Sequence, residues 1–416
     1  FWNGLSRAEA MEHPYWRRPA PGPVLQFLKE RGLTAHGHIL IWNNAKPDWL
    51  YDQYCPEAEK RCFDSWGIVR HADCLKGGTG FDAKAGWIGS FDYRFRTSWF
   101  ENFFDVGLTS EERKTFPPRY KEQMHRCERM IEESAPTYVA NLRRLFRKRV
   151  FDVAGAFGEV VDSWDVVNES SQDWVKYRKS RTGLPVWKSN YGLMPGDYPL
   201  HALLNAKAAF PAKANLAIND YNISNDFLAQ VRDLDTEGVK IDIVGCQMHL
   251  FNTNDCMRLA LGADRISWVG TPQTIQDRLD MMARTGRPLH VSEITITSPG
   301  ADDRCRMIQA ILTRNIYRKW FSHKSLMGIT WWNTVDGGGV KGEPLVSGLF
   351  TRDLKKKPAY EALDQLINHE WKTRLSSKVE VEGGMRKISF RGFRGRYRLS
   401  WKDADGKEQF KLVEVK

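Results

Sequence analysis

Short apolar runs recur along this chain, and each ends abruptly in polar or aromatic residues before a segment with helical periodicity begins. The centres of these runs lack the alternation of apolar and polar residues that a half-exposed strand shows, which predicts strands buried on both faces. Such strands are typical of parallel sheets covered by helices. The predicted strands span residues 33–42, 163–169, 215–222, 241–250, 289–296 and 328–335.

The segments between these strands carry helix signals. In one of them Thr271 supplies an N-cap, Pro272 suits the first helical position, and Gly286 marks the end. Alternating strands and helices predict an α/β fold, either a closed barrel or an open doubly wound sheet. No GxGxxG follows any strand, which weakens the nucleotide-binding form of the open sheet. Further amphipathic helices are predicted over residues 136–153, 224–238 and 302–321.

Three segments depart from this repeat, one of them a second insertion at residues 170–200. Residues 43–135 separate the first predicted strand from its helix, and a connection of this length usually has a function. Residues 371–416 alternate apolar and polar positions, and Asp405-Gly406 marks a hairpin turn. We therefore expect one main domain over residues 1–370, with a large insertion at about 43–135, and a small antiparallel β appendix over residues 371–416.

Composition excludes several classes of protein. The 416 residues contain no apolar run approaching the roughly 18 that a membrane span needs. The net charge of +11 comes from scattered basic residues without a recognised nucleic-acid motif, which favours a solvated basic surface over a nucleic-acid partner. The seven cysteines include no CxxC pair, so we expect no metal site, and Cys55 and Cys62 either form a disulfide or remain thiols. The 16 Trp residues suit a protein that stacks against sugar rings.

Two glutamates occupy unusual positions at strand ends. Glu169 follows the run 163–168, and Glu293 follows the run 289–292. A pair of carboxylates across a cleft is what cleavage of a glycosidic bond requires, because one donates a proton while the other attacks or activates water. The alternative interpretations are a helix N-cap partner for Glu169 and a buried ion pair for Glu293.

Both glutamates lie in longer motifs. Residues 163–169 read SWDVVNE, and residues 290–294 read HVSEI. Five further segments follow the same order along the chain: GHILIW at 37–42, QMH at 247–249, ITWW at 329–332 with Asp336, KPAY at 357–360 and SFRGF at 389–393. Together these motifs resemble those of glycoside hydrolase family 10, the endo-β-1,4-xylanases, and the last is similar to the appendix of plant members. The resemblance implies a (β/α)8 barrel as the catalytic domain.

The resemblance also implies a mechanism. It makes the chain a retaining endo-β-1,4-xylanase in which Glu293 attacks the anomeric carbon while Glu169 first donates and then recovers a proton. Retention implies carboxyl groups only about 5–5.5 Å apart. The charge of Glu293 would raise the pKa of Glu169, as a like-charged neighbour should, so that Glu169 keeps its proton for donation. No cofactor is implied.

A set of sugar-binding residues follows from the same resemblance. Asn168 would hydrogen-bond the 2-hydroxyl, His249 would hold Glu293 in orientation and charge, and Trp332 would form the hydrophobic floor of the subsite. For the histidines and tryptophans of the set, packing in the core is the alternative interpretation. The substrate-binding set is Asn3, His38, Trp42, Asn168, Tyr221, Gln247, His249 and Trp332.

The chain also departs from the family pattern. Ser6 stands where the family has lysine, and Asn43 stands where histidine is common. Only six strands are visible, so either upstream residues are missing or the barrel is unusual. We expect the aromatic-rich insertion at 43–135 to form part of the cleft wall.

The expected protein is a monomer that is secreted, periplasmic or on the cell surface. Its expected partner is a polysaccharide, namely xylan or arabino/glucuronoxylan. The alternatives are a catalytically inactive carbohydrate-binding protein on the same scaffold and a hydrolase of a different β-linked glycan. The presence of both glutamates together with Asn168 and His249 argues against the inactive protein.

Overall fold

The computed structural model describes residues 21–43, 135–179, 186–189, 192–263, 266, 271–340, 342–378 and 380–415. Several predictions from the sequence lie outside the described residues. They are the role of Asn3, the significance of Ser6, the pairing of Cys55 with Cys62, and the cleft-wall role of the insertion, of which residues 44–134 are not described.

The chain divides into two compact units, each considered by itself. The domain boundary predicted between residues 370 and 371 falls inside the second unit, and the division into a main domain and an appendix stays a prediction. The first unit comprises Phe1–Met248, Gln276–Ile294 and His323–Thr330, and the second comprises His249–Ile275, Thr295–Ser322 and Trp331–Lys416.

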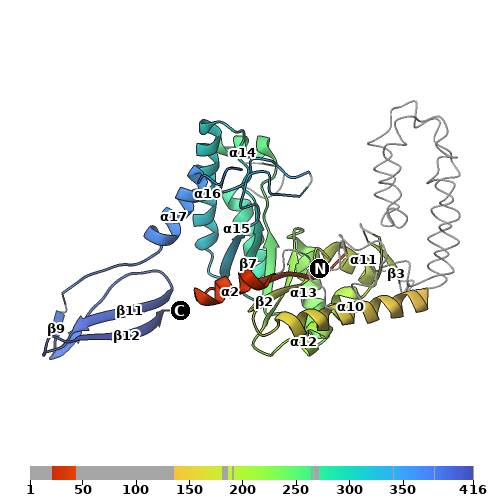
Figure 1. Ribbon diagram of the computed structural model, residues 1–416, viewed down its shortest axis with the longest axis horizontal. Coiled ribbons are helices and arrows are strands. Elements are labelled where there is room, and N and C mark those ends of the chain that lie inside the picture. Colours follow the sequence, from red (N-terminus) through yellow and green to blue (C-terminus); the bar gives the residue numbers. More distant parts are fainter. Residues whose placement is uncertain are drawn as a thin grey trace. The chain divides into compact units, whose positions relative to one another are not determined.

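A six-stranded sheet crosses the first unit (Figure 1). Its strands from β1 to β7 pair in parallel in the order of the chain, and β8 adjoins β7. All residues of β6 and β7 are buried, as the unbroken apolar runs predict. Each predicted strand is present, with ends that differ by a few residues. The bounds are β1 His36–Trp42, β2 Ser163–Asn168, β5 Asn215–Asp220, β6 Ile243–Gln247, β7 Leu289–Ile294 and β8 Leu326–Trp331.

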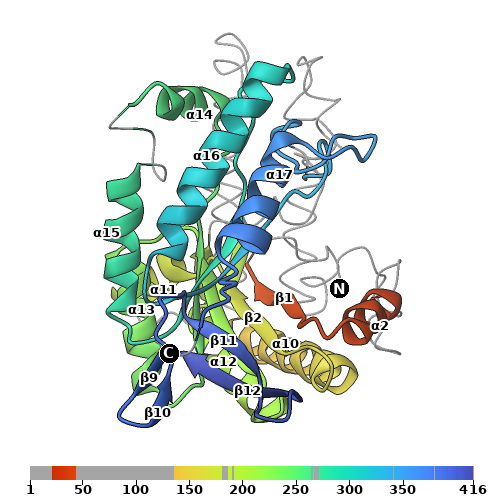
Figure 2. The ribbon, with the colours of Figure 1, turned by 90° about the vertical axis from the view of Figure 1, so that its left-hand side faces the viewer.

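Helices follow the strands, as the periodicity predicted. Ser224 caps α13 by accepting a hydrogen bond from the Asp226 backbone, and Gly286 takes a φ of 73° after α15. In the second unit α16 and α17 pack side by side (Figure 2). No helix among the described residues is long and apolar enough to span a bilayer. The helices are α2 Gly22–Glu30, α10 Ala135–Phe157, α11 Ser171–Lys179, α12 Tyr198–Ala209, α13 Asn225–Thr236, α14 Thr253–Ala260, α15 Pro272–Ala283, α16 Asp303–Phe321, α17 Pro358–Asp364 and the π-helical turn η1 Gln365–Glu370.

The start of β1 shows how sequence sets the two faces of the sheet. Gly37 pairs with Trp164 of β2, and a Cβ at Gly37 would lie 2.2 Å from the Trp164 ring. Only glycine therefore admits this indole, which packs against Phe210 beyond α12. Because side chains alternate along a strand, His36 and His38 both lie on the face opposite to Trp164.

The C-terminal segment forms antiparallel hairpins, as the alternating pattern predicted. The long hairpin turns at Gly406, whose φ is 77°. Residues 388–390, which also alternate, are irregular rather than part of a strand. The strands are β9 Glu380–Glu382, β10 Met385–Lys387, β11 Gly395–Lys402 and β12 Glu408–Val415, and a separate hairpin in the first unit joins β3 Val186–Ser189 to β4 Gly192–Pro195.

Candidate active site

The carboxyl ends of the parallel strands bring the candidate residues together. In the strand register Trp42 of β1 lies beside Asn168 of β2, and Asn168 lies beside Asn219 of β5. Gln247 of β6 lies beside Glu293 of β7. These five residues therefore share one edge of the sheet, which is the edge where (β/α) folds carry their sites.

Three buried amides link the two glutamates. Gln247 donates from Nε2 to Glu169 Oε1 at 3.0 Å and to Asn168 Oδ1 at 3.1 Å. Asn219 donates from Nδ2 to the same Asn168 oxygen and to Glu293 Oε1, both at 2.8 Å. Both amide nitrogens use both of their hydrogens, so this amide chain fixes the orientation of a carboxyl group at each end.

The orientation of Asn219 is set by its surroundings. Ser292 donates its hydroxyl to Asn219 Oδ1, which turns Nδ2 toward Glu293. The neighbouring strand leaves room for the amide only because it carries Gly245, where a Cβ would lie 2.8 Å from Asn219 Oδ1. A glycine in a buried strand thus has a direct consequence for the position of the amide that holds Glu293.

Glu169 leaves β2 in an unusual conformation. Its φ is 55°, in the left-handed region that residues with side chains rarely adopt. The Glu169 N–H donates to the Asn219 carbonyl at 2.8 Å, which holds this turn in place. The carboxyl group then meets Trp42, whose Nε1 donates to Oε2 at 3.1 Å.

The pKa of Glu169 rises to about 7, mainly because the carboxyl group is buried. The hydrogen bond from Gln247 opposes this shift, and the negative charge of Glu293 adds to it. The charge of Glu293, predicted from the sequence to be the cause, contributes less to the raised pKa of Glu169 than the removal of water does. A carboxyl group with this pKa retains a proton near neutrality, as a general acid must.

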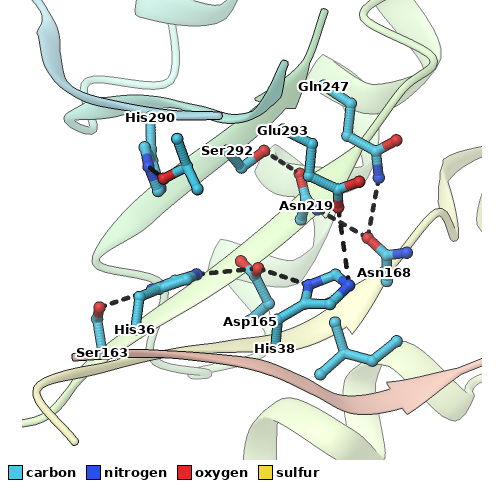
Figure 3. A network of polar contacts seen from close by, with 12 residues as sticks. His36, His38, Ser163, Asp165, Asn168, Asn219, Gln247, His290, Ser292 and Glu293 are labelled. Atoms are coloured by element: carbon cyan, nitrogen blue, oxygen red, sulfur yellow. Dashed lines mark hydrogen bonds and ion pairs between the residues drawn. The ribbon is translucent and has the colours of Figure 1, made fainter. Parts of the chain in front are cut away.

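Glu293 is 5% exposed and lies beside a cluster of histidines and a carboxylate (Figure 3). His38 Nε2 is 3.8 Å from Glu293 Oε1, and His38 Nδ1 is 3.0 Å from Asp165 Oδ2. Burial lowers the pKa of His38, but the hydrogen bond to Asp165 and the charges of the nearby carboxylates outweigh it and raise the pKa. In the described ranges no group of three or more His, Cys, Asp or Glu side chains is placed to hold a metal ion.

Two further candidates lie in the second unit. His249 approaches Thr295 Oγ1 with Nδ1 at 3.1 Å, stacks on Phe251 at 4.4 Å and meets the edge of Trp332 at 6.1 Å. Trp332 donates from Nε1 to Glu343 at 3.3 Å. The predicted hydrogen bond from His249 to Glu293 stays a prediction.

Tyr221 follows the end of β5 directly and is partly exposed, next to the strand end that carries Asn219. Its predicted contact with sugar stays a prediction, as do the sugar contacts of His38, Trp42 and Gln247. The structure shows instead what these three side chains do within the protein, where each hydrogen-bonds a carboxyl group or lies close to one.

Sequence reasoning missed four residues of the site. Asn219 and Ser292 orient Glu293, while Asp165 and His36 extend the cluster beneath it. Asn219 could have been predicted from the sequence, because it is a polar residue near the end of a buried strand, as Asn168 is. No sequence feature distinguishes Ser292, Asp165 and His36 from other residues inside a strand, because their role depends on which strands are neighbours.

A parallel sheet whose carboxyl edge holds two glutamates through buried amides defines a barrel-type glycosyl hydrolase. The chain belongs to glycosyl hydrolase family 10, whose sequence model matches residues 127–366, more than half of its length. The xylanase B structure from Clostridium stercorarium F9 is 18% identical, with a TM-score of 0.52 and 87% of each chain covered. The predicted barrel fold of the family is confirmed by this likeness and by the family match, and the described residues contribute six of its strands.

This chain matches only part of the length of its curated relatives. Endo-1,4-beta-xylanase C of Paenibacillus barcinonensis is 27% identical over 328 residues, which cover 68% of this chain and 29% of the relative. Endo-1,4-beta-xylanase B of Thermotoga neapolitana is 28% identical over 247 residues, which cover 56% of this chain and 64% of the relative. This chain therefore spans less than two thirds of the length of either relative. The likeness of the appendix to plant members stays a prediction.

Proposed function

We propose that this protein is a retaining endo-β-1,4-xylanase with Glu293 as nucleophile and Glu169 as acid/base. The observation that carries the proposal is the different treatment of the two carboxyl groups. Glu169 is held by Gln247 and Trp42 with a pKa of about 7, whereas Glu293 accepts a hydrogen bond from Asn219 and faces His38. Two carboxyl groups with separate environments are what acid/base and nucleophilic roles require.

In the first step Glu293 forms a bond to the anomeric carbon while the bond to the leaving oxygen breaks. The proton of Glu169 passes to that oxygen, and the products are an ester on Glu293, an ionised Glu169 and a free sugar end. The ester removes the negative charge of Glu293. In the second step Glu169 takes a proton from water, the water oxygen attacks the anomeric carbon, and Glu293 leaves as a carboxylate.

The amide chain leaves one donor for the substrate. Asn168 Oδ1 accepts from both Gln247 and Asn219, whereas its Nδ2 has no hydrogen-bond partner among the described residues. A fixed N–H beside the reacting sugar supports binding of the 2-hydroxyl, and this contact strengthens as positive charge develops at the anomeric carbon. The rigid acceptor side of the amide prevents rotation away from the sugar.

Xylan is the proposed substrate because the two relatives described above carry xylanase names, and a polysaccharide chain is the partner. We place the protein outside the cytoplasm, in the secreted or periplasmic space or on the cell surface, where polymeric xylan is met. A monomer suffices for the chemistry, since both glutamates and the three amides come from a single chain.

The test is release of reducing ends from a panel of plain xylan, glucuronoxylan, arabinoxylan, mixed-linkage glucan and mannan. We expect the xylans to be cut to oligosaccharides and Glu293→Gln to abolish the cutting. Glu159→Gln is the matched control, because Glu159 is exposed and, among the residues that the structure describes, pairs with exposed Lys213 alone. Binding of xylan without cleavage would instead indicate the inactive carbohydrate-binding protein, and preference for another polymer would replace xylan as substrate.

A further inference from the structure

Two histidines share one carboxylate oxygen beneath Glu293 (Figure 3). Asp165 Oδ2 lies 2.9 Å from His36 Nε2 and 3.0 Å from His38 Nδ1. The strand register explains the arrangement, because His36 pairs with Ser163 and His38 pairs with Asp165 on the same face of β1 and β2. Asp165 is 2% exposed, and its other oxygen has no hydrogen-bond partner among the described residues.

The acceptor decides where the ring protons lie. An ionised carboxylate only accepts, so His36 Nε2 and His38 Nδ1 both carry hydrogens. Ser163 Oγ, 2.6 Å from His36 Nδ1, completes the environment of the first ring by donating to it when that ring is neutral. The second nitrogen of His38 faces Glu293 at 3.8 Å and forms an ion pair when His38 is charged.

Several ionisable groups surround this cluster. Burial of Asp165 alone would raise its pKa, yet the hydrogen bonds and charges of the two histidines hold that pKa well below its usual range. His290 meets His36 edge-on at 5.3 Å and hydrogen-bonds Thr330 at 2.8 Å, and burial lowers the pKa of His290 to about 4. The titratable groups that raise the pKa of His38 are Asp165, Glu293 and, through its charge, Glu169.

We propose that His36 is a positioning residue for the nucleophile, because its hydrogen bond keeps Asp165 anionic and thereby keeps a proton on His38 beside Glu293. The proposal rests on the function proposed above and adds a residue that acts through two others. Without His36, Asp165 loses one of its two hydrogen bonds among the described residues, so its pKa rises and the proton between Asp165 and His38 shifts toward Asp165. The negative charge of Glu293 is then stabilised less by His38, which lies 3.8 Å away.

The first test is the pH profile of kcat/KM on xylo-oligosaccharides. His36→Phe should move the acid limb upward by about one pH unit, the size of a hydrogen bond to a charged group, with kcat and KM little changed above that limb. His36→Gln retains an amide donor and should restore at least half of the shift. His290→Gln is the matched control, since it removes a buried imidazole that does not touch Asp165, and it should leave the limb in place.

The second test reads His38 directly. With only ten histidines in the chain, ¹⁵N-histidine labelling allows the charge of His38 to be followed by NMR. The titration midpoint of His38 should fall in His36→Phe, and to a smaller extent in Ser163→Ala. Ser163→Ala removes only one hydroxyl group, so it serves as the test if His36→Phe does not fold. This readout needs no turnover, so it separates failure of the positioning role from failure of the proposed activity.

An unchanged His38 midpoint in both variants would overturn the proposal. So would a His36→Phe enzyme whose rate falls equally at every pH while the acid limb stays in place, because a loss of that kind indicates only a packing role. If the His38 midpoint falls in the variants but the wild-type protein cuts no glycan, the proposed function is wrong and the coupling of these histidines is established.

Discussion

The hydrogen bond from Gln247 to Glu169 gives a quantitative prediction for catalysis. This bond lowers the pKa of a carboxyl group that burial has raised to about 7. A hydrogen bond to a charged group contributes about 1.5 kcal/mol, and one pKa unit corresponds to about 1.4 kcal/mol. Replacing Gln247 by Met removes the donor at similar volume, so the pKa of Glu169 should rise by about one unit.

The assay is the basic limb of kcat/KM on a xylo-oligosaccharide, whose leaving group needs a proton. Since kcat/KM reports the free enzyme, the limb should lie near pH 7 in the wild type and near pH 8 in Gln247→Met. The height of the profile will also fall, because Asn168 loses one of its two donors. The position of the limb, not its height, carries the prediction.

Gln230→Met is the control. Gln230 is fully buried and donates to Ser170 Oγ at 2.7 Å, next to Glu169 in the chain but without contact with its carboxyl group. The same chemical change there should leave the limb where it is. A basic limb in Gln247→Met that coincides with the wild type, or moves to lower pH, would refute the assignment of Glu169 as the acid.

Three other predictions follow from the same geometry. In Glu169→Ala, turnover of an activated aryl xylobioside should stall at the ester and recover with azide, and NMR should identify a β-glycosyl azide; an α product would mean inversion. His290 has a pKa of about 4 in the folded protein, so as the pH falls the unfolded chain binds a proton at this position before the folded protein does. The free energy of unfolding of the wild type should therefore fall by up to about 3 kcal/mol from pH 6.5 to 4, and denaturation of His290→Met should show a smaller fall. Gly37→Ala should cost about 1–3 kcal/mol by pushing on Trp164, read as a lower Tm; an unchanged Tm would contradict that packing.

Much of the fold was predictable because the central strands of the sheet are buried along most of their length. Continuous apolar runs therefore marked the strands, and the residues that end them marked the functional edge. Glu169 and Glu293 were found in this way, since a charged residue at the end of a buried run has a cost that packing alone does not explain, whereas Asn168 came from the family resemblance. The helix at 224–238 was equally plain from its Ser cap and its apolar spacing.

The remaining contacts depend on which strands are neighbours and in what register. Asn219 joins Asn168 to Glu293 only because β5 lies beside β2. Asp165 meets His36 and His38 only because β1 and β2 pair without offset at that point. Neither fact follows from local periodicity. The main cause of the raised pKa of Glu169 was missed for a similar reason, because the extent of burial at a strand end depends on everything packed around it.

The central claim is a covalent bond between Glu293 and the sugar, and trapping tests it most directly. A 2-deoxy-2-fluoro xylobioside with an activated leaving group slows both steps but keeps formation of the ester faster than its hydrolysis. Mass spectrometry of the intact chain should then show one added fluoro-sugar, and peptide mapping should place it on Glu293, with Glu293→Gln unlabelled. A label on Glu169, or full turnover to a product of inverted configuration with no adduct, would contradict the account.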